Sequence, residues 1–314
     1  MPAREPTRPL RAAPRQDAPR PTNQDTPRPT RTLPYLALGL GVVGLGLSAI
    51  FVRWADAPGA VTGFYRTGIA ALVMALPFGL AVRRQPLRAG RPVWMAVLAG
   101  LCFAADLGLW NTSVLMTTAA NATFLANTAP LWVGLGALVL FRERLRFAFW
   151  LGLLTALAGA GILLGGDFLA GAAAGLGGLL ALAAGFFYAG FFLATQRARE
   201  GLGAFTSWWL SALASALGLL LACLLLGQPL TGYTTAAYLN FLALALVTQV
   251  GSYLFVNYAL GHLPASIVSP TLLLQPIATL LLAIPLLGER PDLGRALGGL
   301  LVVAGVWIVN RHSR

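Results

Sequence analysis

Residues 127–164 read NTAPLWVGLGALVLFRERLRFAFWLGLLTALAGAGILL, and residues 273–309 read LLQPIATLLLAIPLLGERPDLGRALGGLLVVAGVWIV. A shift of 146 residues aligns these two stretches and the residues before them without a gap. The identical pairs include Asn111 with Asn257, Ala119 with Ala265, Pro130 with Pro276, Glu143 with Glu289, Arg144 with Arg290, Gly152 with Gly298, Ala158 with Ala304 and Gly159 with Gly305. Shared composition explains matches of Leu and Ala, but not matches of Asn, Pro, Glu and Arg in one register. The sequence therefore predicts an internal repeat.

Apolar residues dominate the chain. Of its 314 residues 57% are hydrophobic and 10% are charged, with a mean hydropathy of +0.74. An ordinary soluble domain carries roughly 25% charged residues. The apolar residues form long blocks, as a helix needs if it is to cross a hydrocarbon core of ~30 Å, and they do not alternate with polar residues as barrel strands do. The composition predicts an all-α polytopic membrane protein.

The apolar blocks predict ten transmembrane helices in two sets of five. The first set is 35–52, 60–82, 93–110, 119–141 and 147–164, and the second is 175–195, 206–226, 236–260, 265–287 and 293–309. Residues 1–34 are rich in Pro and Arg, which predicts a disordered tail. The repeats are then 35–164 and 175–309, joined by a Gly/Ala-rich linker. Because five is odd, the two copies are expected to be inverted in the membrane, an architecture typical of secondary transporters.

The basic residues predict the orientation. The formal net charge is +12, and every basic residue other than histidine is Arg. The arginines lie in the tail and the short loops, which favours a topology signal over nucleic-acid binding. With the N-terminus inside, the outward loops hold only Arg53, Arg290 and Arg295. Positively charged loops resist translocation, so both termini are predicted to be cytoplasmic, with the protein in the cytoplasmic (inner) membrane.

The two quoted stretches resemble the EamA repeat of the drug/metabolite transporter (DMT) superfamily. The main feature is a mid-helix Pro followed by Gly-Glu-Arg, present as Pro276 and then Gly288-Glu289-Arg290. The first copy departs from it, with Phe141-Arg142-Glu143 in place of Gly-Glu, so a tight glycine turn lacks its glycine there. The resemblance implies a ten-helix carrier with a central cavity that exports or exchanges amino acids, other metabolites or toxic compounds. It identifies no substrate.

Two ionisable residues lie inside predicted spans, Arg66 in the second and Asp106 in the third, both in the outer half of the membrane. Intramembrane charges are costly and usually have a partner or a function. Three interpretations stay open. The two residues form a structural ion pair, they act in transport by attracting a carboxylate or binding a coupling proton, or Arg66 reaches the outer headgroups.

Polar residues also follow one face of the eighth span, where Gln249, Tyr253 and Asn257 are four residues apart. The corresponding set in the third span is Asp106, Trp110 and Asn111. These residues are candidates for the substrate path, because amide and aromatic groups suit a cavity that binds small polar solutes. The alternative is that Asn and Gln join neighbouring helices by hydrogen bonds.

Hydroxyl and amide residues cluster before Pro130 in the fourth span and before Pro276 in the ninth. A proline inside a helix leaves a carbonyl four residues back without its hydrogen bond. The neighbouring polar groups can satisfy that carbonyl, and the two kinks are also candidate hinges at the repeat interface.

The residue types weigh against other functions. The chain contains no Lys, which excludes a phosphate loop or a Schiff base built on lysine, and its two histidines lack ligand neighbours. We therefore expect no cofactor, metal site or enzymatic activity. An intramembrane enzyme acting on lipids is a weaker alternative, because its clustered carboxylates are missing. A nucleotide-sugar or multidrug carrier of the same superfamily is the main alternative to a carrier of amino acids. The sequence does not identify the substrate, the direction of transport, the coupling ion or the oligomeric state.

Overall fold

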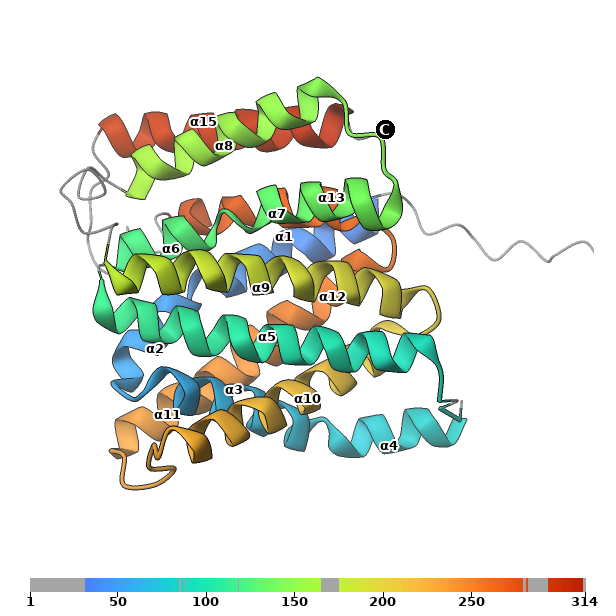
Figure 1. Ribbon diagram of the computed structural model, residues 1–314, viewed down its shortest axis with the longest axis vertical. Coiled ribbons are helices and arrows are strands. Elements are labelled where there is room, and N and C mark those ends of the chain that lie inside the picture. The colour runs from blue at the N-terminus through green and yellow to red at the C-terminus, as the bar shows by residue number, and fades with distance from the viewer. Residues whose placement is uncertain are drawn as a thin grey trace, which may run out of the picture.

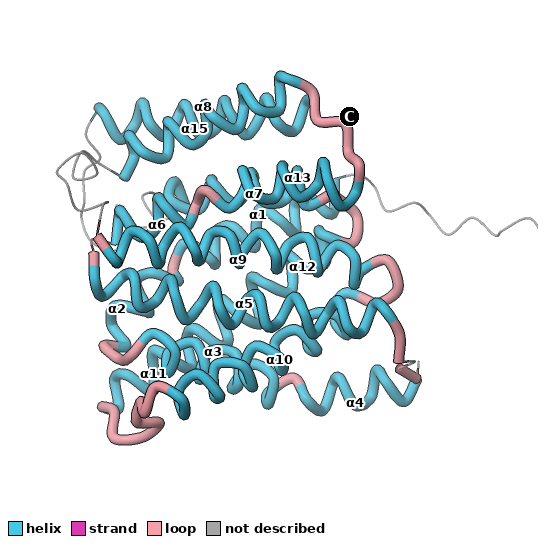
Figure 2. The backbone as a smooth tube through the Cα atoms, in the orientation of Figure 1, coloured by secondary structure: helices cyan, strands magenta, loops and turns pink. Residues whose placement is uncertain are grey.

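The computed structural model describes residues 32–84, 86–87, 89–117, 119–164, 175–278, 281 and 293–312. All regular structure in these residues is helical, and the helices lie side by side in one bundle (Figures 1 and 2). The predicted disordered tail lies almost wholly outside the described residues. The linker 165–174 and the Gly-Glu-Arg turn of the second copy lie outside them as well.

The first described helix begins at Thr32, where the described residues begin, and it includes the predicted start of the first span at residue 35. The helices of the first repeat are α1 (Thr32–Gly46), α2 (Ser48–Ala55), α3 (Gly59–Val73), α4 (Ala75–Arg84), α5 (Arg91–Met116), α6 (Ala119–Ala126), α7 (Ala129–Gly136), the π-helix η1 (Ala137–Phe141) and α8 (Phe147–Leu164). Each predicted span of this repeat thus corresponds to one helix or to consecutive helical segments.

The second repeat has the same plan. Its described helices are α9 (Leu176–Arg199), α10 (Ala204–Leu225), α11 (Thr235–Ala243), the π-helix η4 (Leu244–Ser252), α12 (Tyr253–Leu260), α13 (Ala265–Thr271), the 3₁₀ segment η5 (Leu272–Leu274) and α15 (Leu293–His312). The helix after η5 continues over residues 275–278. The rest of the predicted ninth span, 265–287, runs beyond the described residues.

The lengths of these helices fit a membrane protein. Within the described residues, seven helices are long and apolar enough to cross a bilayer, or eight if the bent pair Gly59–Val73 and Ala75–Arg83 counts as one span. Two shorter apolar helices, Phe147–Ile162 and Ala265–Ala278, complete the apolar set. Many large apolar side chains on the outside of the bundle are exposed, Leu72 and Phe147 among them, as expected of surfaces that face lipid.

The second span is bent rather than straight. The axes of α3 and α4 differ by 48°. Pro77 lies in the first turn of α4. In a regular helix its ring would clash with the carbonyl of Val73, four residues earlier, so the helix breaks at Met74. The carbonyl of Ala71 near this break accepts a hydrogen bond from Trp209 Nε1 at 2.9 Å.

The loop after η1 makes its turn without a glycine. Arg142 has a φ of 54° and caps the π-helix in the left-handed conformation. The second copy has Gly288 at this position of the alignment. A left-handed conformation costs a non-glycine residue roughly 1–2 kcal/mol. The first copy therefore keeps the turn that its sequence does not favour.

The two repeats interlock rather than sit apart. The helix α5 of the first repeat packs against α9 of the second, and η4 and α12 of the second repeat pack in the same way against α1 of the first. These pairings are equivalent under the internal repeat, since they join the third span to the sixth and the eighth span to the first. In Figure 1, α5 begins at the right-hand end of the bundle and α11 begins at the left-hand end, so equivalent spans run in opposite directions.

The fifth and tenth spans, α8 and α15, form a pair with its own apolar core, which includes Phe149, Leu153 and Val302. Glycines bring the two backbones together. A Cβ atom on Gly152 would lie 2.8 Å from the carbonyl oxygen of Gly305, and one on Gly159 would lie 2.7 Å from that of Gly298. Only glycine fits so close an approach, as in other tightly packed membrane helices.

Candidate functional site

Arg66 on α3 is the centre of a buried polar cluster. It is 2% exposed. Its Nε donates to Gln249 Oε1 on η4 at 3.1 Å, and its Nη1 donates to Ser48 Oγ on α2 at 3.0 Å. Its Nη2 is buried and has no hydrogen-bond partner. The guanidinium thus joins three helical segments and keeps one donor unused.

Aromatic rings surround this guanidinium. Its central carbon lies 5.4 Å from the ring centroid of Tyr253 and 5.9 Å from that of Phe103. The hydroxyl of Tyr253 is hydrogen-bonded to that of Tyr188 on α9 at 2.9 Å, and Phe191 packs against all three rings. A cation at the faces of aromatic rings is attracted by their quadrupoles, which partly replaces the hydration lost on burial.

Arg66 and Asp106 do not form the direct ion pair that was one of the interpretations of the sequence. Asp106 is 6% exposed and lies one turn beyond Phe103 on α5. In the described part of the chain no group hydrogen-bonds to its carboxylate, and the ion pair that does form is between Arg197 and Glu200. Arg66 is turned instead toward Ser48 and Gln249. The snorkelling interpretation of Arg66 also fails, because its side chain is held inside the protein by these bonds.

The polar stripe of the eighth span is divided between a π-helix and an α-helix, whereas its spacing assumed one regular α-helix. Gln249 lies within η4, and Tyr253 begins α12. Both are buried, and the carbonyl of Gln249 accepts a hydrogen bond from Trp208 Nε1 at 3.0 Å. Wide π-turns are uncommon and often occur at functional sites. Here the turn brings the Gln249 amide to Arg66.

Asn257, the third residue of the stripe, lies further along α12, away from Arg66. Its side-chain Oδ1 is buried and unpaired, while its backbone carbonyl accepts from Arg199 Nε at 3.2 Å. It is close to the end of α9 rather than to the aromatic cluster. The structure therefore places Gln249 and Tyr253 in the cluster with Arg66 and leaves Asn257 outside it.

The candidates at the end of α5 are separate from the cluster. Asn111 Nδ2 donates to the carbonyl of Gly59 at 2.9 Å and so joins α5 to the start of α3. This is the helix-joining role that was the alternative for these amides. Trp110 is half-buried next to it.

The two candidate kinks coincide with breaks in the helices. Pro130 is the second residue of α7, directly after the break between α6 and α7. Pro276 follows the 3₁₀ segment η5 in the same way. Thr128 Oγ1 donates to the carbonyl of Leu125 at 2.7 Å, and Thr271 Oγ1 to that of Ile267 at 2.8 Å. The carbonyls four residues before Pro130 and Pro276 are those of Ala126 and Leu272, so these two bonds are not the ones that the prolines were expected to require.

The sequence interpretation missed two members of the cluster. Ser48 and Trp208 both bond directly within it. Tyr188 also bonds within the cluster, and its sequence signal is slight because a lone aromatic residue in a span is usually a packing residue. A serine and a tryptophan among apolar residues carry no periodic signal, and their role depends on which helices pack together.

Comparison with known proteins agrees with this fold. The profile of the EamA-like transporter family matches residues 32–165 and 175–311. No curated protein sequence matches the chain. A solved structure titled "Crystal structure of protein" superimposes with a TM-score of 0.70 at 21% identity, and the match covers 90% of this chain and 99% of that chain. Such low identity shows a shared fold alone.

Proposed function

Because the chain belongs to the EamA-like transporter family, we propose that it is a secondary carrier of small organic metabolites such as amino acids. It works by alternating access, in which two inverted five-helix repeats exchange conformations around one central site. Export or exchange is the proposed direction of transport. The repeats are residues 35–164 and 175–309.

The proposed topology has ten spans. The helices that are long enough to cross a bilayer, together with the bent pair and the two shorter apolar helices, support this number. Both termini are proposed to be cytoplasmic and the membrane to be the inner membrane, because of the arginine distribution. In Figure 1 the start of α1 and the end of α15 lie at the same end of the bundle, which supports termini on one side.

The buried Arg66 with its unpaired Nη2 is the observation that carries the proposal. Removing a guanidinium from water costs several kcal/mol unless partners compensate for it. Neutral groups, Ser48 and Gln249, satisfy two of its nitrogens, and the third is left for another acceptor. A carboxylate or another anionic oxygen of a solute is the group that binds best to a free guanidinium donor.

The cluster also belongs to both repeats. Arg66, Ser48 and Phe103 come from the first repeat, and Gln249 and Tyr253 come from the second. A site formed between inverted repeats changes its access when one repeat moves against the other. Solute binding at this position would therefore be coupled to the movement of the repeats.

Transport by the purified protein in liposomes tests the proposal. Vesicles loaded with an unlabelled amino acid or metabolite should accumulate the same labelled compound by counterflow, with and without a proton gradient. Protein-free vesicles and the variant Arg66→Gln are the controls. Counterflow that is equal in wild type and Arg66→Gln would contradict a site at Arg66.

A further inference from the structure

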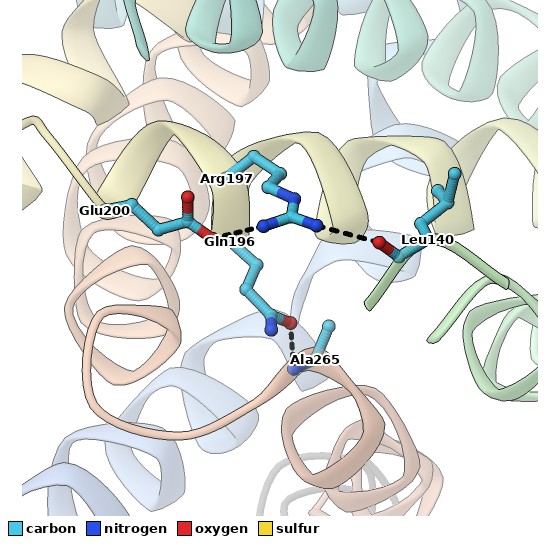
Figure 3. A network of polar contacts seen from close by, with 5 residues as sticks. All are labelled: Leu140, Gln196, Arg197, Glu200 and Ala265. Atoms are coloured by element: carbon cyan, nitrogen blue, oxygen red, sulfur yellow. Dashed lines mark hydrogen bonds and ion pairs between the residues drawn. The ribbon is translucent and has the colours of Figure 1, made fainter. Parts of the chain in front are cut away.

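Three segments are tied together at the end of the bundle where the chain's termini lie. Glu143, just after η1, accepts a hydrogen bond from Ser266 Oγ at the start of α13 at 2.6 Å. Gln196 Oε1 near the end of α9 accepts from the backbone N–H of Ala265 at 2.7 Å. Arg197 Nη2, next along α9, donates to the carbonyl of Leu140 in η1 at 2.8 Å. Figure 3 shows Gln196 and Arg197 reaching in different directions from α9, one to each neighbour.

Arg197 is held in place by two further contacts. Its guanidinium carbon lies 4.1 Å from the centroid of the Phe141 ring, and its Nη1 donates to Glu200 at 2.8 Å. A cation near the C-terminal end of a helix is also stabilised by the partial negative charge of the carbonyl oxygens that are left unpaired there. The end of η1 is thus fixed to α9 by a bond, a ring contact and charge.

The tied segments are the ones that a carrier would have to separate. The fourth span (α6, α7 and η1) and the ninth (which begins with α13) are equivalent in the repeat, and both are broken at a proline. The helix α9 carries Tyr188 of the aromatic cluster two turns before Gln196. The three bonds thus join the fourth span, the ninth span and the helix that carries Tyr188.

Beyond these bonds, at the end of the bundle where the termini lie, the protein surface is open to solvent. A cavity of about 240 Å³ lies there, and it is lined by Gln196, Arg199, Glu200 and His262 among others. Glu200, Gly261 and His262 are exposed. The bonds of Gln196 therefore lie between the surface at this end and the interior of the bundle.

We propose that Glu143, Gln196 and Arg197 form a latch that holds the transport path shut on the side of the termini. This inference rests on the proposed carrier function. The latch joins both repeats to each other, since Glu143 and Leu140 belong to the first and the other partners to the second. Its opening requires the fourth and ninth spans to separate from each other and from α9, because its bonds join all three segments.

The serine of this latch has no hydroxyl counterpart in the first repeat. In the repeat alignment Glu143 corresponds to Glu289, and Ala265 and Ser266 correspond to Ala119 and Ala120. Ala120 has no hydroxyl to donate. The residue that aligns with Ser266 therefore cannot donate a side-chain hydrogen bond like the one from Ser266 to Glu143.

Cysteine accessibility tests the latch without a known substrate. Ser269 lies one turn after Ser266 on α13, is 2% exposed and has an unpaired hydroxyl. Ser269→Cys is therefore a conservative substitution, and its thiol reports access to the interior. It is placed in a background with Cys102→Ala and Cys223→Ala. A membrane-impermeant maleimide is added to vesicles whose N-terminal tag faces the medium.

Glu143→Gln and Ser266→Ala should each raise the labelling rate of the reporter about tenfold, since each weakens one hydrogen bond to a charged group. Ser266→Ala introduces the residue that the first repeat has at Ala120. The control Asp56→Asn removes an exposed carboxylate at the other end and keeps a side chain that tolerates the left-handed φ of 42° there. It should leave labelling unchanged.

Unchanged labelling in both latch variants, or an equal rise in Asp56→Asn, would overturn the latch. The readout is independent of transport. A carrier that transports normally but shows no change in labelling refutes the latch alone, whereas absent transport with a large change in labelling refutes the carrier function alone. Gel filtration in detergent confirms that each variant is folded.

Discussion

At the scale of single residues, Arg66 combines burial with incomplete pairing. Its partners are the uncharged Ser48 and Gln249, and the rings of Phe103 and Tyr253 contact its face. Asp106 is buried on the neighbouring helix α5 and makes no bond to it. A buried guanidinium and a buried carboxyl group that form no bond with each other are a costly arrangement, and a cost of this kind persists in membrane proteins mainly at functional positions.

The first prediction concerns Arg66. Arg66→Gln should lower counterflow about tenfold or more, because one charge-assisted hydrogen bond is worth about 1.5–3 kcal/mol. Arg66→Lys should recover little, since an ammonium group cannot reach Ser48, Gln249 and a solute with the planar fork of a guanidinium. Arg53→Gln is the matched control, because Arg53 is exposed at the end of α2. Equal losses in Arg53→Gln and Arg66→Gln would remove Arg66 from the site.

The second prediction concerns Asp106, whose carboxylate is available to bind a proton. If Asp106 couples transport to protons, Asp106→Asn should abolish the pH dependence of uptake while it keeps the shape of the side chain. Initial uptake rates measured from pH 5 to 8 check this. A variant with the wild-type pH profile would show that Asp106 is not the coupling group.

Residue types in the sequence could predict which charges would be buried but not what they would touch. Arg66 and Asp106 lie at similar depths in adjacent spans, and depth was the only basis for pairing them. The rotation of each helix about its own axis decides the partner. In the structure that rotation turns Arg66 toward α2 and η4, so Ser48 and Gln249 rather than Asp106 receive its hydrogen bonds.

At the scale of elements, the breaks in the helices lie where the chain departs from regular α-geometry. The breaks at Pro130 and near Pro276 could be predicted, because a proline removes a helical bond. The bend at Met74 was missed, although Pro77 was a signal for it. The π-helix η4 has no local sequence signal of this kind, and its wide turn depends on packing against α1 and α3.

The third prediction concerns the turn at Arg142. Arg142→Gly should raise the free energy of unfolding by up to about 1 kcal/mol, because glycine adopts the left-handed conformation without steric strain. Arg144→Gly is the control in the same loop, where φ is not positive and the added backbone freedom should lower stability slightly. Thermal unfolding in detergent compares the two. A stabilisation by Arg144→Gly as large as that by Arg142→Gly would show that strain at residue 142 is not the cause.

At the scale of the whole molecule, the repeat in the sequence becomes a repeat in packing. The third span packs on the sixth as the eighth packs on the first, and α8 and α15 pair with each other. A sequence shift of 146 residues predicted which residues are equivalent. It could not predict that the halves interlock, since the contacts between them depend on three-dimensional docking rather than on periodicity within either half. Interlocked, oppositely directed halves are what an alternating-access carrier needs.

The inverted arrangement in the membrane is tested most directly by the sidedness of two equivalent residues. Arg144 is exposed in the loop after the fourth span, and Arg290 aligns with it in the second copy. Arg144→Cys and Arg290→Cys are introduced separately into the protein with Cys102→Ala and Cys223→Ala. Each variant is labelled in vesicles with a membrane-impermeant maleimide. Inverted repeats predict that Arg144→Cys reacts only from the side of the N-terminal tag and Arg290→Cys only from the opposite side. Reaction of both from the same side would contradict the inverted repeats and the carrier mechanism built on them.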